Sequence, residues 1–335
     1  MMTKRERMLA TLHHVQPDRV PYQIHFTQAA RERLYAYWRD PRRFDRVDNA
    51  FTGLAAGPVQ PWQEIAKDFW RDPFGVIWNR SVDKDIGVVA NVCVTPDNLD
   101  DYRFPSLDEP AFDVTYDDFI ASHGDAFIVA DLGFSLFERA WTLAGMENLL
   151  LAMAEEEEFA HRLLDRILDY NLQIIERACR HRIDAMMFGD DWGMQTGLIM
   201  GAPRWRHFLK PRLQKMYSAV KTHGKFVFIH SCGKVDEIFP DLIEIGLDVF
   251  NPFQPEVMDV FEIKRRYGDR LCFYGGISTQ RTLPYATPEE TCDEVKRLVR
   301  EIGRNGGYIA APAHAIPGDA KPENVEAMLE ALTTI

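Results

Sequence analysis

The sequence has few cysteines, fewer basic than acidic residues and no long apolar run. Its five cysteines, among 335 residues, lie far apart and form no paired framework, which fits a reducing cytosol. No apolar run approaches the roughly 20 residues that cross a bilayer. The opening segment "MMTKRERMLATLHH" is charged where a signal peptide would be apolar. We therefore expect a soluble, cytoplasmic protein that does not enter a membrane.

Charge and motif content exclude further classes. The formal net charge of −12 argues against a surface for nucleic acid or for an anionic membrane. No Gly-x-Gly-x-x-Gly follows the first expected strand, which weakens a dinucleotide-binding fold. Apolar residues make up 46%, enough for a sizeable core, and no repeat or low-complexity linker divides the chain. We expect one domain over residues 1–335, with an irregular insertion at about 50–115, and the oligomeric state stays open.

Apolar segments alternate along the chain with amphipathic helical ones, a pattern typical of a parallel sheet covered on both faces. Seven strands are expected at 20–25, 127–131, 185–189, 226–230, 248–251, 271–275 and 307–312. Helices are expected at 27–50, 146–181, 203–224, 235–246, 260–268, 287–303 and 321–335. An eighth strand from the irregular region would complete an α/β fold of the (β/α)8 TIM barrel type. A doubly wound sheet is the alternative.

Polar residues stand at the ends of the expected strands, where a barrel gathers its active site. They are His25, Asp131, Asp190, Asp191, His230, Cys232, Asn251, Gln254, Tyr274 and His314. Ordinary loop starts would favour Ser, Thr, Gly and Asn over His and Cys. His230, Cys232 and His314 could provide three ligands with an open fourth position, as in a catalytic zinc site. A buried cysteine and hydrogen-bonded histidines remain the alternative on this pattern alone.

The acids and amides have two interpretations each. Asp190 and Asp191 are adjacent at a strand end and point in opposite directions, so we expect one to handle a proton or anchor the substrate and the other to be structural. Asp131 either contacts the substrate or caps a turn. His25, Gln195, Asn251, Gln254 and Tyr274 are expected to contact the substrate, although the amides could equally cap loops. Trp192, Phe253 and Tyr274 are expected to line the mouth, unless they are core.

The segments "TKRERMLATLHHVQPDRVPY", "FGDDWGMQTGLIMGAPRWRHFLKPRLQKM", "HSCGKV", "DVFNPFQ", "FYGGISTQRTLPYATPEE" and "GGYIAAPAHAIPGDAKPENV" occur in this order. Together they resemble the uroporphyrinogen decarboxylase superfamily over nearly the whole chain, on the branch that includes corrinoid-dependent methyltransferases. The resemblance implies a barrel with a deep pocket at its C-terminal face.

The resemblance also separates two chemistries. True uroporphyrinogen decarboxylases carry an Arg-Gln-Ala-Gly-Arg segment that helps hold the many carboxylates of the substrate. This chain has "IHFTQAARERL" there, without the glycine and with displaced arginines. Decarboxylation of an octa-acid porphyrinogen is therefore not expected.

The methyltransferase branch holds zinc with a His-x-Cys pair and a later cysteine, and the zinc binds a thiol substrate as thiolate. His230 and Cys232 match the pair, and His314 stands where the second cysteine would be. The resemblance implies a zinc-dependent methyltransferase acting on a small substrate. The chain has no Asp-x-His-x-x-Gly corrinoid motif, so any cobamide is expected on a separate corrinoid protein. A metal-independent decarboxylase with an Asp as general acid and a non-catalytic ligand binder are the alternatives.

Overall fold

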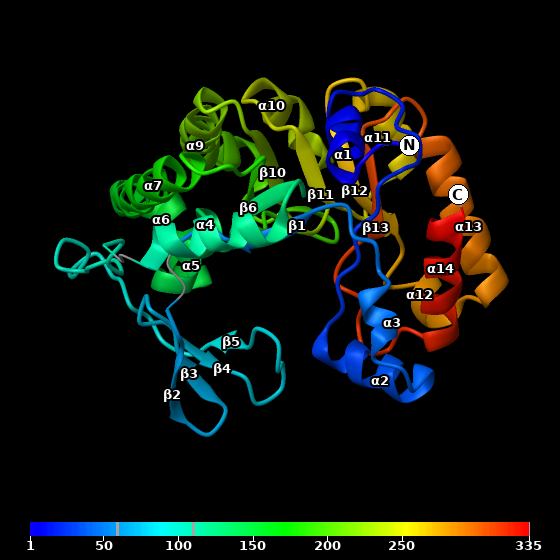
Figure 1. Cartoon of the computed structure of the whole chain (residues 1–335). Helices are drawn as coiled ribbons and strands as arrows, with labels where there is room; N and C mark the ends of the chain where they lie inside the picture. Colours follow the sequence, from blue (N-terminus) through cyan, green and yellow to red (C-terminus); the bar gives the residue numbers. More distant parts are fainter. Residues whose placement is uncertain (58–59, 109–110, 335) are drawn as a thin grey trace.

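A curled sheet of seven parallel strands forms the centre of the computed structural model, which describes residues 1–57, 60–108 and 111–334 (Figure 1). In sheet order, the strands are β1 (Thr52–Ala55), β6 (Ile128–Leu132), β7 (Ala185–Gly189), β10 (Phe226–His230), β11 (Val249–Phe253), β12 (Cys272–Ile277) and β13 (Tyr308–Pro312). The fold is TIM-barrel-like α/β, as the sequence predicts, and β1 is the strand expected from the irregular region.

The predicted strand at 20–25 is wrong: this segment forms only isolated bridges, Tyr22 to Ala310 and Phe26 to Ile316. It lies between β13 and β1 and fills the gap in the ring. Its main chain bonds to β13 through Gln23 N–H and Ala310 O at 3.0 Å. Towards β1, the Asn49 side chain takes the place of a strand, because it accepts from Ile24 N and donates to Ile24 O.

Antiparallel strand pairs occupy part of the irregular region. The strands β2 (Gln63–Ala66), β3 (Phe69–Arg71), β4 (Ile77–Asn79) and β5 (Val88–Val89) form a small sheet. This sheet lies with α2 (Gln28–Trp38) at one end of the molecule, at the bottom of Figure 1. A further pair, β8 (Gly193–Met194) and β9 (Gly197–Leu198), follows β7.

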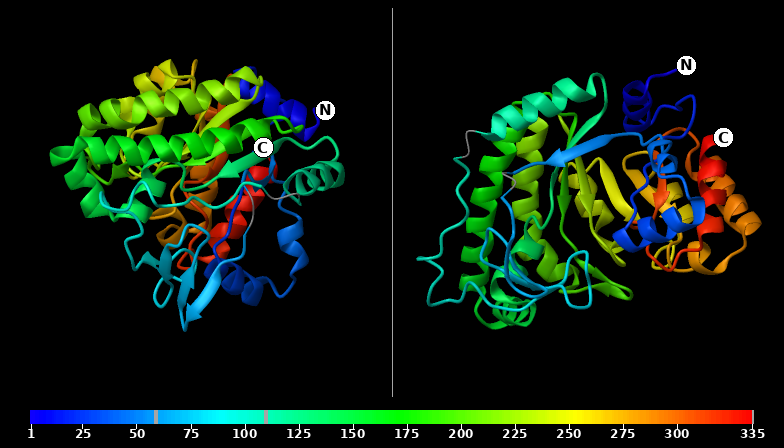
Figure 2. Two further views of the ribbon diagram at one scale, coloured as in Figure 1. Left: turned by 90° about the vertical axis from the view of Figure 1, so that its left-hand side faces the viewer. Right: turned by 60° about the horizontal axis from the view of Figure 1, so that its bottom comes forward.

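Helices surround the parallel sheet (Figure 2). They are α1 (Lys4–Leu12), α3 (Arg42–Asp45), α4 (Ala111–His123), α5 (Phe137–Ala144), α6 (Met146–Glu155), α7 (Glu157–Cys179), α8 (Gly201–Arg204), the π-helix η1 (Trp205–Leu209), α9 (Lys210–Thr222), the 3-10 helix η2 (Asp236–Ile238), α10 (Phe239–Glu244), α11 (Val260–Tyr267), α12 (Thr282–Tyr285), α13 (Pro288–Ile302) and α14 (Pro322–Thr334). The single helix predicted over 27–50 is wrong, because α2 ends at Trp38 and its C-cap residue Arg39 has a left-handed φ of 54°. Among the described residues, no helix is long and apolar enough to cross a membrane.

Two apolar layers follow from the alternation of side chains along each strand. In β10, Val227 and Ile229 pack outward against the helices, whereas Phe228 points into the ring. The inner layer also includes Met8 and Leu12 of α1, which close the N-terminal end of the barrel. The ring is therefore filled at that end, and space for a ligand remains only towards the C-terminal strand ends.

Two loops at those strand ends approach each other at glycines. A Cβ on Gly193 would lie 2.5 Å from the carbonyl oxygen of Cys232, and a Cβ on Gly233 would lie 2.5 Å from Gly193 C. The loops are joined by hydrogen bonds from Trp192 N to Ser231 Oγ at 3.1 Å and from Lys234 N to Met194 O at 2.8 Å. The position of Cys232 therefore depends on the absence of a side chain at Gly193.

Gly193→Ala is expected to destabilise the protein by roughly 1–3 kcal/mol, because backbone has to move to admit the methyl group. Gly133→Ala is the matched control, since a Cβ there meets nothing within 4 Å. The measurement is the urea midpoint of each variant against the parent. Equal midpoints for the two variants would contradict the close packing of these loops.

Candidate metal centre and cavity

A cavity of about 320 Å³ opens at the C-terminal ends of the strands. This volume lies near the lower end of the roughly 300–1,000 Å³ typical of ligand pockets, which favours a small ligand. The lining residues come from the inward face of the ring and from the segment that closes it. They are Gln23, His25, Phe51, Gly53, Val129, Asp131, Met187, His230, Asn251, Tyr274, Pro312, His314 and Ala315.

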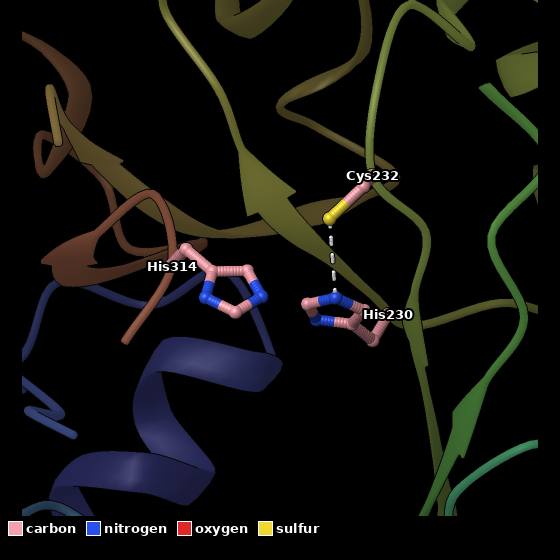
Figure 3. A group of neighbouring side chains, drawn as sticks. All are labelled: His230, Cys232 and His314. Carbon is pink, nitrogen blue, oxygen red and sulfur yellow. Dashed lines mark hydrogen bonds between the residues drawn. The ribbon is translucent and has the colours of Figure 1, made fainter. Parts of the chain in front are cut away.

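The three predicted metal ligands converge beside this cavity. One ligand atom each of His230, Cys232 and His314 lies within 4.8 Å of the other two. Figure 3 shows His314, from the loop after β13, facing the imidazole of His230, with Cys232 Sγ beside that ring. The two imidazole centroids are 5.6 Å apart, and Cys232 Sγ lies 3.3 Å from His230 Nε2. Residues that are 82 positions or more away from His314 in sequence thus meet across the barrel.

The Asn251 side chain fixes the tautomer of His230. Asn251 Nδ2 donates to the carbonyl oxygen of Tyr274 at 3.0 Å, so its Oδ1 must face the histidine. His230 Nδ1 lies 2.6 Å from that oxygen and therefore carries the proton. The lone pair of His230 is then on Nε2, which points to Cys232 and His314. Outer hydrogen bonds of this kind orient histidine ligands in metal sites.

The three residues fit Zn²⁺. With Zn–N near 2.0–2.1 Å and Zn–S near 2.3 Å, neighbouring ligand atoms of a tetrahedral site lie about 3.5 Å apart. The distance of 3.3 Å between Cys232 Sγ and His230 Nε2 is close to this ligand-to-ligand distance. Burial, together with the charges of Asp191 and Glu138, raises the pKa of the Cys232 thiol well above its usual range. A cation at this position would compensate the thiolate, and its binding would release the proton.

Further titratable groups face the same space. Burial raises the pKa of Asp131 to about 6, partly opposed by the charge of His230. Burial and the charge of His314 lower the pKa of His25. Gln23, which sequence reasoning missed, accepts from Phe51 N through its Oε1 and places its Nε2 3.3 Å from His25 Nε2. Its position two residues before His25 in an inward-facing segment could have indicated it.

The two adjacent aspartates have different surroundings, and neither is among the residues that line the cavity. Asp190 is fully buried and accepts from Glu138 N at 2.8 Å and from Trp192 Nε1 at 2.6 Å. It also accepts from Leu136 N at 3.3 Å, so it caps the start of α5 and does not reach the cavity. Asp191 is partly exposed, accepts from Cys232 N at 2.7 Å and lies 3.8 Å from His230 Nε2.

A third carboxyl group, Glu138, lies close to both aspartates and was not predicted. Burial and the charges of Asp191 and Asp190 raise the pKa of Glu138 well above its ordinary value. Burial likewise raises the pKa of Asp190 to about 7, although its three donors oppose this. Both shifts favour the protonated carboxyl groups and so limit the negative charge gathered behind Cys232.

Several of the other residues that were expected to contact the substrate or line the mouth lie away from the cavity. Gln195 is exposed in the turn between β8 and β9. Gln254 is buried, with its Oε1 3.4 Å from Gly233 N, so it supports the loop after Cys232. Trp192 and Phe253 are fully buried in the helix-side core, and of the three expected mouth aromatics only Tyr274 lines the cavity. Asn251 does line it, but its amide is engaged by His230 and Tyr274.

A second group of potential ligands lies on the outer surface of the barrel. Glu157, His161 and His207 bring one ligand atom each within 4.8 Å of the others. His161 Nδ1, however, lies 3.1 Å from Arg212 Nη2 and accepts a hydrogen bond from it. His161 would have to give up that bond to bind a metal through Nε2 with Nδ1 protonated. This cluster serves as a control in metal-binding experiments.

The family model described as "Uroporphyrinogen decarboxylase (URO-D)" matches residues 134–335, which include the three converging residues. The chain belongs to the uroporphyrinogen decarboxylase family. Over its full length the URO-D fold superposes on a methyltransferase from Methanosarcina mazei with a TM-score of 0.74, covering 100% of this chain and 99% of the other. At 19% identity, this likeness establishes the fold.

Curated relatives of this URO-D family member carry two different names. Uroporphyrinogen decarboxylase of Chlorobaculum parvum is 24% identical over 59% of this chain and 58% of its own length. The methylcobamide:CoM methyltransferase of Methanosarcina barkeri is 28% identical over 40% of this chain and 37% of its own length. The chain thus spans less than two thirds of these relatives, and their names leave the choice between decarboxylase and methyltransferase open.

Asp190→Ala is expected to lower the free energy of unfolding by roughly 2–4 kcal/mol, because three buried donors lose their acceptor. Asp191→Ala is the matched variant and should change it by less than about 1 kcal/mol, since water can reach the single amide it frees. Urea midpoints of the two purified variants provide the comparison. A larger loss for Asp191→Ala would contradict the structural role assigned to Asp190.

Proposed function

We propose that this protein is a zinc-dependent methyltransferase that moves a methyl group between a methylcobamide, carried on a separate corrinoid protein, and a small substrate. The convergence of His230, Cys232 and His314 carries the proposal, and the two histidines line the cavity. Likeness to a protein named as a methylcobamide methyltransferase supports it. The corrinoid protein would approach the C-terminal rim, since α1 fills the other end of the ring.

In this proposal, Zn²⁺ held by the three residues would lower the pKa of a thiol substrate enough to keep it as thiolate at neutral pH. Asn251 keeps His230 Nε2 directed at the metal position through the 2.6 Å bond to Nδ1. Asp191, at 3.8 Å from His230 Nε2 and 38% exposed, would accept the proton that the substrate gives up and pass it to water. His25, Asp131 and Tyr274 would contact the rest of the substrate from the cavity wall.

The cavity does not suit a porphyrinogen that carries many carboxylates. Among the described residues, no lysine or arginine lines it, and its one carboxylate would repel an acidic substrate. One observation favours the alternative of a metal-independent decarboxylase for another substrate: the raised pKa of Asp131, about 6, suits a general acid. The two functions differ in their need for metal.

Purified protein is expected to bind one zinc ion at the cavity. The substitutions Cys232→Ala and His314→Ala should each lower the zinc affinity by more than about 100-fold. Loss of outer partners alone costs about 10–100-fold, and loss of a ligand should cost more. His207→Ala is the control, because it removes only the surface cluster. Competition with a chromophoric chelator gives the affinities. Parent-like zinc affinity in Cys232→Ala, together with loss in His207→Ala, would assign the metal to the surface.

The zinc-loaded protein is expected to demethylate free methylcobalamin in the presence of small thiols, seen as a change in the cobalamin spectrum. His314→Ala should abolish the reaction because it loses a metal ligand, and His207→Ala should retain it. No spectral change with any thiol, or with a corrinoid protein supplied, would count against a methyltransferase. Turnover of uroporphyrinogen by the metal-free protein would favour a decarboxylase instead.

A further inference from the structure

The described residues that line the cavity include an acidic side chain but no lysine or arginine. Asp131 is the one lining residue in the described chain whose side chain is a carboxylate, and no lysine or arginine lines the space. The other titratable lining groups are His25, His230 and His314, together with Tyr274. The cavity therefore holds one acidic group with no fixed cation beside it.

Asp131 is directed into the cavity by the alternation of β6, in which Val129 also points inward. Parallel pairing places Asp131 beside Met187, and Met187 beside Phe228. Asp131 is thus level with Phe228, two residues deeper than His230. Its side chain is exposed to the cavity, and among the described residues none donates a hydrogen bond to its carboxylate. A ligand that fills the cavity displaces water from this carboxylate, so it has to offer a positive or hydrogen-donating group in return.

Aromatic surfaces lie in the same inner layer. Phe51 and Tyr274 both line the cavity, with ring centroids 5.7 Å apart in an edge-to-face arrangement. Aromatic rings next to a carboxylate favour an ammonium group, which is attracted by the ring faces as well as by the charge. The same surroundings disfavour a sulfonate or carboxylate, which would be desolvated without a partner.

We propose that the small substrate is a thiol that carries an ammonium group, with its sulfur at His230, Cys232 and His314 and its ammonium at Asp131. This rests on the proposed zinc site. Formal charges support it: two neutral imidazoles and one thiolate leave one positive charge on a Zn²⁺ site, and Asp131 adds one negative charge. An aminothiolate adds none, so the charges of the zinc site, Asp131 and the substrate sum to zero, whereas a thiolate with a sulfonate would bring this sum to two negative charges.

Three two-carbon thiols of equal length test the proposal on cobalt-substituted protein: cysteamine, 2-mercaptoethanol and 2-mercaptoethanesulfonate. The intensity of the thiolate-to-cobalt band gives their dissociation constants. Cysteamine should bind at least about tenfold more tightly than the sulfonate, a difference of about 1.4 kcal/mol. Asp131→Asn keeps the shape of the side chain. It should reduce the ratio of the sulfonate to the cysteamine dissociation constant at least about fivefold. The dissociation constant of 2-mercaptoethanol should stay within about twofold of its value in the parent protein. Equal or tighter binding of the sulfonate, or an unchanged ratio in the variant, would overturn the proposal.

A second measurement needs neither metal nor activity. Thermal midpoints of metal-free protein are recorded with 2-(methylthio)ethylamine and with 2-(methylthio)ethanesulfonate, which cannot bind as thiolates. The amine should stabilise the parent protein and not Asp131→Asn, and the sulfonate should stabilise neither. If no thiol binds cobalt but the amine effect persists, the proposed zinc chemistry fails and the cation site stands. If thiols bind cobalt but the amine effect is absent, the cation site fails and the zinc chemistry stands.

Discussion

Alternation of inward and outward side chains along the parallel strands decides which residues can meet in the cavity. In β10, Phe228 fills the ring and His230, two residues later, reaches the cavity wall. β6 repeats this with Val129 and Asp131. A shift of one residue in either strand would turn the functional side chain into the helix layer. The contact between His230 and Asn251 then depends on the register of β10 with β11, which pairs these two residues directly.

The same alternation explains how much of the site could be predicted from the sequence. Strand ends that carry His and Cys identified His230, Cys232 and His314, and counting by two from Val129 places Asp131 inside the ring. It also turns Asp190 outward, since Gly189 before it faces inward. The sequence could not reveal that the Asn49 side chain replaces a strand partner at Ile24, because this contact joins segments 25 residues apart.

Other misjudged residues depend on packing between distant loops. Trp192 is drawn into the core by Trp205, with ring centroids 5.4 Å apart, and by its bond to Asp190. Glu138 became important only because α5, which the sequence analysis did not predict, starts beside Asp190. Glycine at 193 gave no sign of its role, since its contact with the Cys232 carbonyl joins residues 39 positions apart. Local patterns identify chemistry at strand ends, whereas these contacts require the closed ring.

The closed floor of the barrel has a consequence for the order of events. Met8 and Leu12 of α1 fill the N-terminal end of the ring together with Phe228, so the cavity is a pocket with one mouth. A large carrier domain seated over that mouth would cover it. Any small molecule that reacts inside would then have to enter before the carrier arrives and could leave only after the carrier departs. If a carrier docks as proposed, the single mouth would make substrate binding precede docking and product release follow undocking.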